Sequence, residues 1–291
     1  MKILLFGANG QVGREVIAAT ADAGDIALAA ATRDDADLAV QGSVAALVAR
    51  ARHDLIINAA AWTGVDKAES EAGAVRRING EAPGELAASA RRHGARLIHL
   101  STDYVFPGAP ADGPLDETSA ARPLNVYGET KLLGERLVLD ACPDAVVLRT
   151  SWVYSSHGSN FVRTMLRLAA TKAEVSVVAD QIGGPTPARA IADACLKIAR
   201  RENGPGGVFH FQGAPPASWA DFAEAIFTAA NAKTSVTRIE TSAYPTPARR
   251  PLYTVLNCSK ILRDYGVEQP DWRRDLPSTV ARILNVDPSQ L

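Results

Sequence analysis

Cysteines, metal-ligand motifs and long apolar runs are scarce or missing in this sequence of 291 residues. The three cysteines, Cys142, Cys195 and Cys258, are odd in number and far apart, which fits neither a disulfide framework nor a zinc site. The five histidines include no H-E-x-x-H motif or comparable ligand pair. We therefore expect reduced thiols, no metal site and a cytoplasmic location.

The sequence also lacks an excess of charge, because 31 basic and 32 acidic residues give a formal net charge of −1. Without a dense basic run, there is no electrostatic reason to expect a nucleic acid as partner. The apolar stretch at residues 3–6 is too short for a secretory signal, and no apolar run approaches a membrane-spanning length. Neither nucleic acid nor membrane is expected as a partner.

Short apolar runs alternate with helical patterns through the first half of the chain. Strands are expected at residues 2–6, 25–30, 54–58, 95–101 and 145–150, and helices at 11–22, 43–52, 66–93 and 126–140. Apolar runs without polar alternation are typical of strands covered on both faces. This alternation predicts an α/β fold with a doubly wound, Rossmann-like parallel sheet.

The second half is less regular, with helices expected at residues 160–171, 188–201, 218–231 and 273–284. Stretches rich in proline and glycine separate these helices. We expect residues 1–150 to form an NAD(P)-binding Rossmann-like domain. Residues 151–291 are expected to form mainly a smaller substrate-binding lobe, with some segments returning to the Rossmann sheet.

A glycine-rich loop, Gly7-Ala-Asn-Gly10-Gln-Val-Gly13, follows the first expected strand and opens a helix. Glycines here permit a tight turn and let backbone N–H groups approach a pyrophosphate, which the helix N-terminus also favours. The glycines would also suit a tight turn without a ligand, but their place at the first strand–helix junction favours dinucleotide binding. The spacing resembles that of extended short-chain dehydrogenases/reductases.

The end of the second expected strand bears on the choice between NADH and NADPH. An acidic side chain there would bind a ribose 2′-OH, whereas an arginine would bind a 2′-phosphate. Thr32 and Arg33 occupy this place and favour NADPH, although Asp34 and Asp35 follow directly and would offset the charge. NADH, with Arg33 as a solvated loop residue, therefore stays open.

Three residues form a candidate catalytic group for ketone reduction. Thr102 follows the fourth expected strand, and Tyr127 and Lys131 lie four residues apart at the start of a helix, on one face. A tyrosine hydroxyl can give a proton to a developing alkoxide while a nearby lysine lowers its pKa and binds the nicotinamide ribose. A packed tyrosine beside a surface lysine is the alternative, which the order of the motifs disfavours.

Over nearly its whole length the sequence resembles the dTDP-4-dehydrorhamnose reductases. The stretches that carry the resemblance are residues 7–13, 58–69, 101–108, 123–131, 149–154, 180–186 and 242–251. The resemblance implies reduction of the C4 ketone of dTDP-4-dehydro-L-rhamnose by NAD(P)H, with Thr102, Tyr127 and Lys131 as the reductase triad. A homodimer is left open.

The resemblance also implies binding residues. The pyrophosphate would contact Gly10, Gln11 and Val12, the adenine side Asp37 and Leu38, and the central ribose region Ala61, Trp62 and Thr63. The sugar would contact Thr102 and Asp103 and pack on Trp152, which is otherwise a core residue. By charge complementarity alone, Arg249 and Arg250 are candidates for the substrate diphosphate.

Two positions depart from the family pattern. Tyr253 replaces an amide side chain, and Trp62 stands where a histidine is common. The exact sugar is therefore open, and a reductase of another nucleotide-linked 4-keto-deoxysugar is an alternative. A dehydratase or epimerase of the same superfamily fits less well, because Tyr104 stands where a dehydratase carries its second carboxylate.

A non-catalytic NADP-binding subunit is an alternative from a different class. The regulatory subunit of eukaryotic methionine adenosyltransferase resembles this fold and family. Thr102, Tyr127 and Lys131 are all present, which favours an enzyme.

Overall fold

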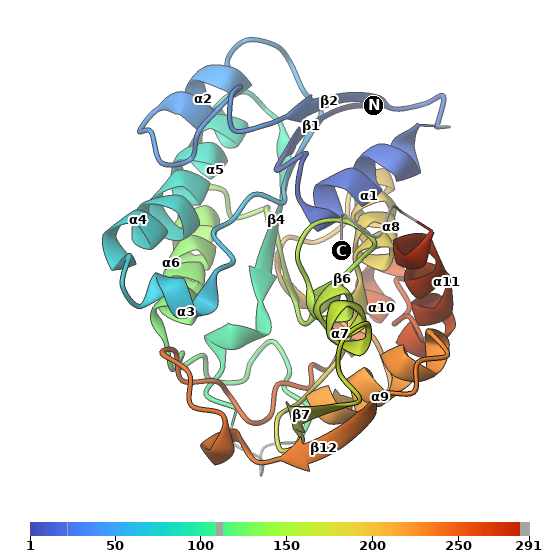
Figure 1. The fold of residues 1–291 in the computed structure, drawn as a ribbon. Helices are drawn as coiled ribbons and strands as arrows, with labels where there is room; N and C mark the ends of the chain where they lie inside the picture. The colour runs from blue at the N-terminus through green and yellow to red at the C-terminus, as the bar shows by residue number, and fades with distance from the viewer. Residues whose placement is uncertain (22, 109–112, 286–291) are drawn as a thin grey trace.

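A six-stranded parallel sheet forms the centre of the computed structural model, which describes residues 1–21, 23–108 and 113–285. The strand order is β2-β1-β3-β4-β5-β10 (Figure 1). The strands are β1 (Lys2–Phe6), β2 (Ala27–Ala31), β3 (Leu55–Asn58), β4 (Arg96–Thr102), β5 (Val146–Thr150) and β10 (Gly207–His210). The predicted doubly wound α/β fold is thus confirmed, with small shifts of strand ends.

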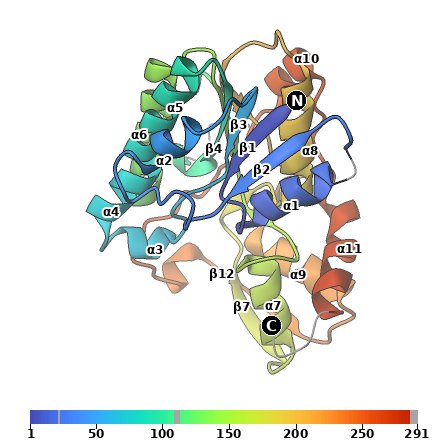
Figure 2. The same cartoon turned by 90° about the horizontal axis from the view of Figure 1, so that it is seen from above.

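Helices cover both faces of this sheet (Figures 1 and 2). One face carries α2 (Ser43–Val48), α5 (Ala82–Arg92) and α6 (Val126–Ala141), and the other carries α1 (Gln11–Thr20), α8 (Ala188–Arg200) and α10 (Ser259–Tyr265). Successive side chains of a strand point to opposite faces, so in β1 Ile3 and Leu5 enter one core while Leu4 and Phe6 enter the other. Burial on both faces explains the unbroken apolar runs.

A third hydrophobic core lies beyond the carboxyl edge of the sheet, in the lower part of Figure 1. It is built by α7 (Phe161–Ala169), α9 (Trp219–Ala229) and α11 (Trp272–Leu284), with the parallel pair β7 (Glu174–Val178) and β12 (Ser235–Ile239). Short pairs join this region together: β6 (Val153–Tyr154) with β9 (Thr186–Pro187), and β8 (Ile182–Gly183) with β11 (Ala217–Ser218). In sequence, β10 lies between elements of this third core, after α7 and β7 and before α9 and β12. It nevertheless pairs with β5 and belongs to the main sheet.

The expected single helix over residues 66–93 is wrong. The structure has α3 (Val65–Ala68), α4 (Ala72–Arg76), a π-helical turn (Arg77–Glu81) and then α5. Asn79 explains the interruption, because its side chain bonds both the backbone N–H and the carbonyl of Trp62. The backbone of this turn lies close to α6 at Gly134. A Cβ on Gly134 would lie only 2.2 Å from the Asn79 carbonyl oxygen, so the approach requires a glycine there.

Other differences concern ends and weak elements. The first helix ends at Thr20, and Asp22, its expected end, lies outside the described residues. The α10 helix and the β7–β12 pair were not expected, because β12 is largely exposed and has no apolar run. Among the described residues, no helix has the length and apolar character needed to cross a bilayer. The three cysteines are buried and unbonded.

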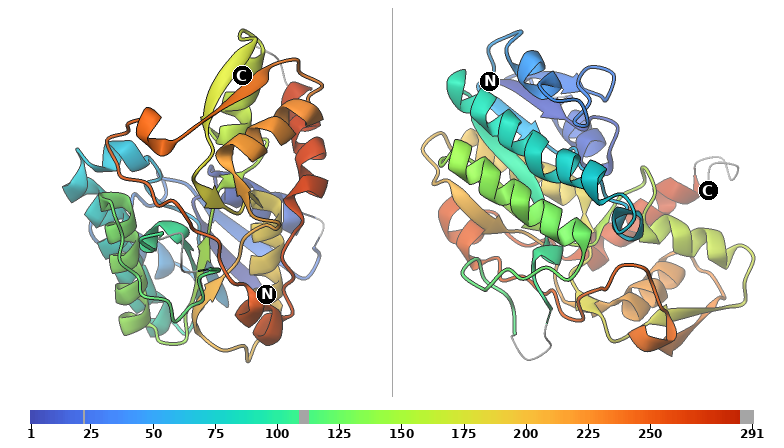
Figure 3. Two further views of the ribbon diagram at one scale, coloured as in Figure 1. Left: turned by 90° about the horizontal axis from the view of Figure 1, so that it is seen from below. Right: turned by 90° about the vertical axis from the view of Figure 1, so that its left-hand side faces the viewer.

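The order of the strands determines where a ligand can bind. Successive crossovers run in opposite directions from β1, to β2 on one side and to β3 on the other. In open α/β sheets this reversal leaves a crevice outside the carboxyl ends of the strands. The glycine loop after β1 and residues 59–63 after β3 both lie there. The right-hand view of Figure 3 shows α5 and α6 side by side along the sheet, with the elements of the third core beyond its end.

Candidate active site

The glycine loop after β1 has the geometry of a phosphate cradle. Gly7 has a φ of +85° and lies against Ala59, where a Cβ would come within 2.7 Å of the backbone. A Cβ on Gly13 would lie 2.1 Å from the Gly7 carbonyl oxygen, so this glycine allows close helix–strand packing. Gly10 is the N-cap of α1 and its own N–H donates to the Gly7 carbonyl at 2.9 Å, so the backbone N–H groups left for a ligand are those of the first residues of α1 that follow it.

A cavity of about 490 Å³ opens beside this loop at the carboxyl edge of the sheet. Most residues expected to bind the cofactor line it: Gly7, Gly10, Gln11, Val12, Thr32, Arg33, Asp37, Leu38, Ala61, Thr63, Tyr127 and Lys131. Gly13 and Trp62 are not among the lining residues. Trp62 instead has its indole N–H bonded to the Gly64 carbonyl and lies under the Lys67 ammonium.

Several lining residues were not anticipated from the sequence. Ile78 comes from the unexpected π-helical turn, and Gly158 and Ser159 come from the loop before α7. The Gln11 side chain holds that loop, since its Oε1 accepts hydrogen bonds from Ser155 and Asn160. Thr150 also lines the cavity, and its buried hydroxyl has no hydrogen-bond partner among the described residues. An unsatisfied buried hydroxyl at this place fits a polar ligand.

The charges at the end of β2 leave Arg33 available. The Asp35 carboxylate accepts hydrogen bonds from the Thr32 backbone N–H at 2.8 Å and from its hydroxyl at 2.9 Å. These bonds lower the pKa of Asp35, with a smaller contribution from Arg50. The exposed Arg33 side chain lines the cavity and makes no hydrogen bond or ion pair within the described part of the chain. The Asp35 carboxylate is therefore hydrogen-bonded to Thr32 and does not pair with Arg33.

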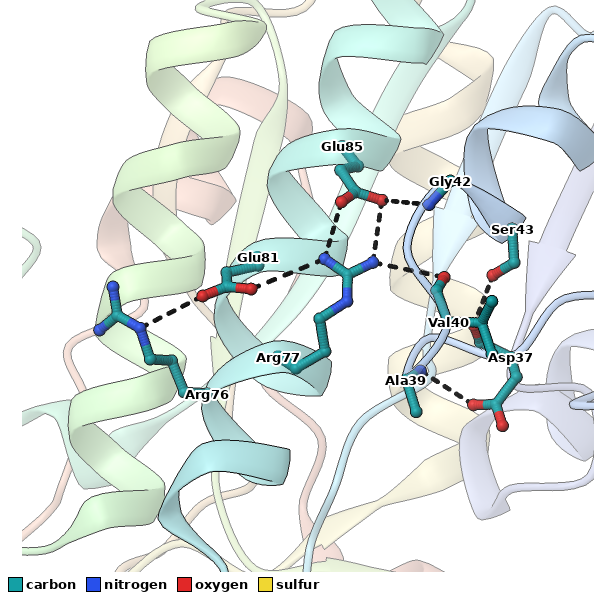
Figure 4. Close-up of polar contacts among 9 residues, drawn as sticks. All are labelled: Asp37, Ala39, Val40, Gly42, Ser43, Arg76, Arg77, Glu81 and Glu85. Atoms are coloured by element: carbon teal, nitrogen blue, oxygen red, sulfur yellow. Dashed lines mark hydrogen bonds and ion pairs between the residues drawn. The ribbon is translucent and has the colours of Figure 1, made fainter.

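The loop that carries Asp37 and Leu38 is fastened to the π-helical turn (Figure 4). The two terminal nitrogens of Arg77 donate to the Glu85 carboxylate at 2.7 and 2.9 Å, and one also donates to the Val40 carbonyl at 3.4 Å. Glu85 in turn accepts a bond from the Gly42 backbone N–H at 3.1 Å. This pair, which we call the Arg77–Glu85 clamp, fixes the loop whose residues Asp37 and Leu38 line the cavity.

The expected catalytic residues come together from two elements. Thr102 ends β4, while Tyr127 and Lys131 lie on the first turns of α6. Asn125 caps that helix, since its Oδ1 accepts from the Gly128 N–H at 2.8 Å. A Cβ on Gly128 would lie 2.2 Å from the Tyr104 carbonyl oxygen, so this glycine lets α6 press against the turn after β4.

Burial controls the protonation of this group. The Tyr127 pKa is raised by burial, and a hydrogen bond with Thr102 partly offsets the rise. The Lys131 side chain is 2% exposed, and burial lowers its pKa to about 8, while Glu135 acts in the opposite direction. Its Nζ donates to the Leu100 carbonyl at 2.7 Å. At neutral pH the arrangement therefore offers a protonated phenol beside a weakly acidic ammonium.

Asp103 is buried next to Thr102 and has an unusual carboxyl group. Its Oδ1 accepts from the Thr102 hydroxyl at 3.1 Å, whereas its Oδ2 has no hydrogen-bond partner among the described residues. Burial raises the pKa of Asp103 to about 6, with hydrogen bonds from Thr254 and Thr102 acting against the rise. The free oxygen can accept a hydrogen bond from a ligand hydroxyl.

A buried ion pair behind the site was missed by the sequence analysis. Arg149 donates from Nη2 and Nε to the two Glu135 oxygens at 2.6 and 2.9 Å, and Ser101 also donates to this carboxylate. Glu135 follows Lys131 by four residues on the same helix face, which is the one sequence signal for it. The pair satisfies its own charges, so it supports β5 and α6 and does not supply a free charge.

The residues expected to bind the substrate all lie outside the cavity lining, Thr102 and Asp103 as well as Trp152, Arg249 and Arg250. Trp152 stacks on Trp219 with ring centroids 3.5 Å apart, and a Cβ on Gly183 would lie 2.6 Å from its ring. These contacts favour the packing role that the sequence left open. Arg250 is paired with Asp66, whereas the exposed Arg249 side chain has no partner among the described residues. Their contacts with a sugar nucleotide stay predictions.

Tyr104 was not expected to take part in the site. Its ring packs edge-on against that of Tyr127, with centroids 5.7 Å apart. Its hydroxyl accepts a hydrogen bond from Arg250 at 3.4 Å. Tyr104 therefore links the C-terminal segment to the candidate acid.

Comparison with known proteins gives a consistent result. The model of the RmlD substrate binding domain family matches residues 1–285. A dTDP-4-dehydrorhamnose reductase of Burkholderia thailandensis is 45% identical over 300 residues, covering 98% of this chain and 100% of that protein.

Two solved structures agree. A dTDP-4-dehydrorhamnose reductase from Clostridium acetobutylicum has a TM-score of 0.93 and 36% identity, covering 98% of this chain and all of that one. A dTDP-4-dehydrorhamnose reductase from Bacillus anthracis in complex with NADP has a TM-score of 0.90 and 33% identity, with 96% and 98% covered.

Proposed function

Because this chain belongs to the RmlD substrate binding domain family, together with the dTDP-4-dehydrorhamnose reductases, we propose that it reduces dTDP-4-dehydro-L-rhamnose to dTDP-L-rhamnose. The single observation that carries the proposal is that Tyr127 and Lys131 line the cavity of about 490 Å³ beside the glycine loop, with Thr102 hydrogen-bonded to Tyr127. The chain is accordingly an NAD(P)H-dependent oxidoreductase of nucleotide-sugar biosynthesis.

The cavity fits a nicotinamide dinucleotide. Gln11 and Val12, at the start of α1, line the cavity, and the unpaired Thr150 hydroxyl lies at the same space. The α1 N-terminus has no acidic residue in its first turn and no capping side chain, so its N–H groups are free for a phosphate. When bound, the reduced nicotinamide supplies the hydride that attacks C4 of the sugar.

In the proposed mechanism, the protein moves one proton and stabilises one oxygen. Tyr127, which burial keeps protonated, donates its proton to the developing alkoxide. Thr102 turns its hydroxyl proton from Asp103 to that oxygen, and Lys131 stabilises the phenolate that remains. Asp103 holds a sugar hydroxyl through its unpaired Oδ2. Each of these roles rests on position and chemistry.

NADPH is the proposed preference, with NADH as the weaker coenzyme. Arg33 lines the cavity without a partner among the described residues, so its charge is available for a 2′-phosphate. Asp35, which would weaken that charge, is held by Thr32. The B. anthracis relative was solved with NADP.

Two further proposals concern the setting of the enzyme. A cytoplasmic location agrees with three buried, unbonded cysteines. A homodimer is the proposed assembly, and its mass in solution, measured by light scattering, tests it. The non-catalytic binding subunit is the weaker alternative. A protein that only binds NADP has no need for a buried Tyr127, Lys131 and Thr102 placed together.

Product analysis tests the proposal directly. Purified protein is incubated with NADPH and dTDP-4-dehydro-L-rhamnose, or with another nucleotide-linked 4-keto-deoxysugar of different ring stereochemistry, and the products are identified by NMR. We expect dTDP-L-rhamnose as the preferred product. Preference for the other sugar would contradict the substrate assignment and would implicate Tyr253 or Trp62, the two positions that depart from the family pattern. No reduction of either sugar by protein that binds NADPH would favour the binding subunit.

A further inference from the structure

A buried histidine lies behind the catalytic lysine and has no role in the mechanism above. His99, on β4, is 0% exposed. Its Nε2 lies 3.5 Å from Lys131 Nζ, and its Nδ1 lies 3.0 Å from the side-chain nitrogen of Asn58 at the end of β3. The two ring nitrogens therefore face different partners. The position of the ring proton decides whether Nε2 offers Lys131 a hydrogen-bond donor or an acceptor.

The neighbours of Asn58 determine that position. The Asn58 Oδ1 accepts a hydrogen bond from the Ala60 backbone N–H at 3.1 Å, which turns its NH₂ group toward His99. An amide nitrogen can only donate, so Nδ1 of His99 accepts. Burial and the nearby Lys131 lower the His99 pKa well below its usual range, so the ring is neutral. A neutral ring that accepts at Nδ1 carries its proton on Nε2.

The Nε2–H group consequently points a donor at Lys131. An ammonium group has only donors, whereas a free amine has a lone pair that can accept this hydrogen bond. Among the other groups around the lysine, the Leu100 carbonyl accepts from Nζ at 2.7 Å and serves either form. Glu135 favours the ammonium, but its two oxygens are bonded to Arg149 and Ser101. Tyr127 is uncharged.

We propose that His99 is a positioning residue for Lys131: fixed by Asn58 as the Nε2–H tautomer, it favours the free amine and so lets the ammonium release its proton readily. This deepens the proposed function, on which its catalytic part rests. After Tyr127 has given its proton to the alkoxide, an N–H bond of Lys131 breaks and the O–H bond of Tyr127 forms again. Lys131 then regains a proton from the bulk solvent, which is the one proton that the overall reduction consumes.

The chain offers a matched set of variants. In His99→Gln the side-chain oxygen can accept from Asn58 while its NH₂ group still donates to Lys131. In His99→Leu both bonds are lost. In Asn58→Asp the carboxylate accepts from Nδ1–H, which moves the ring proton and turns Nε2 into an acceptor for the ammonium. His93→Leu, in the turn after α5, is a control outside the site.

Lys131 titration, followed by NMR of ¹³C-labelled lysine, tests the proposal without requiring activity. We expect a wild-type midpoint near 8. His99→Leu and Asn58→Asp should raise it by about one pH unit, roughly the effect of one hydrogen bond, and His99→Gln and His93→Leu should not. An unchanged midpoint in His99→Leu would overturn the proposal, whatever Asn58→Asp shows, because the new carboxylate raises the Lys131 midpoint by its charge alone.

The ¹⁵N shifts of His99 in the unmodified protein give a second test that needs no variant to fold. An unprotonated Nδ1 and a protonated Nε2 are expected, and the reverse would overturn the proposal. In an active enzyme the alkaline limb of kcat should shift upward with the Lys131 midpoint, and a limb that stays fixed would overturn the catalytic part. An enzyme with no reductase activity but the expected NMR results would refute the proposed function alone.

Discussion

Nη2 of Arg250 lies 2.7 Å from Oδ2 of Asp66, so an ion pair joins the C-terminal segment to α3. The Ala248 backbone N–H also donates to Asp66, at 3.2 Å, and the Asn125 side chain donates to the Arg249 carbonyl at 2.8 Å. The segment that carries both arginines is therefore fixed to the region around the first turn of α6. Arg250 also donates to the Tyr104 hydroxyl, and its charge is already paired with Asp66.

The first prediction separates these two roles of Arg250. If its guanidinium binds the substrate diphosphate, Arg250→Met should raise the KM for the sugar nucleotide about tenfold, the effect of one charge-assisted hydrogen bond. Asp66→Asn should not raise it, because the arginine is then released to the ligand. Steady-state kinetics with varied sugar nucleotide measure both. An unchanged KM in Arg250→Met would leave Arg250 as a purely structural partner of Asp66.

The second prediction concerns coenzyme choice. Arg33→Ser should lower the ratio of kcat/KM for NADPH to that for NADH by about ten- to a hundredfold, because a bond between arginine and a 2′-phosphate is lost. Arg50→Ser, on the same side of the domain but absent from the cavity lining, is the control. Equal loss with both coenzymes would contradict a specific role for Arg33.

The third prediction concerns the Arg77–Glu85 clamp. Arg77→Met should raise the KM for NADPH about five- to tenfold and leave kcat nearly unchanged, because the loop with Asp37 and Leu38 loses its fastening. Arg76→Met is a matched control, since the Arg76 side chain is 60% exposed and that of Arg77 15%. A similar KM in the two variants would refute the clamp.

The fourth prediction uses the buried carboxyl group. Because the Asp103 pKa is raised to about 6, the folded protein holds an unfavourable charge above that pH, and the penalty is lost as the carboxyl becomes protonated on acidification. Asp103→Asn should therefore be more stable at pH 8 by roughly 1 to 3 kcal/mol, with the difference vanishing below about pH 4. Urea unfolding at both pH values measures this. Equal or lower stability of the variant at pH 8 would contradict the argument.

Much of the fold follows from local pattern. Apolar runs indicate the buried strands because both faces of the sheet are covered. The glycine loop identifies the first strand–helix junction because Gly7 and Gly13 each leave no room there for a side chain. The separation of α4 from α5 did not follow, since it involves the Asn79 side chain, which bonds the backbone of Trp62 in the loop after β3. Periodicity along a helix contains no information about such a contact.

The candidate site divides in the same way. Residues in a fixed motif, such as Tyr127 and Lys131, could be predicted because their spacing on a helix determines their geometry. Partners from distant strands could not. Arg149 meets Glu135, and His99 meets Lys131, only because parallel pairing places β3, β4 and β5 side by side beneath α6. The sequence shows that these side chains are present, but it does not show the strand register that brings them together.

The most direct test of the central claim is the initial rate of NADPH oxidation with dTDP-4-dehydro-L-rhamnose, for the wild type and for Tyr127→Phe. Folding of the variant is checked by NADPH binding. If Tyr127 is the acid, the variant binds NADPH but oxidises it at least about a hundredfold more slowly, the usual contribution of general acid catalysis. A variant that keeps the wild-type rate would contradict the proposed mechanism at its central residue.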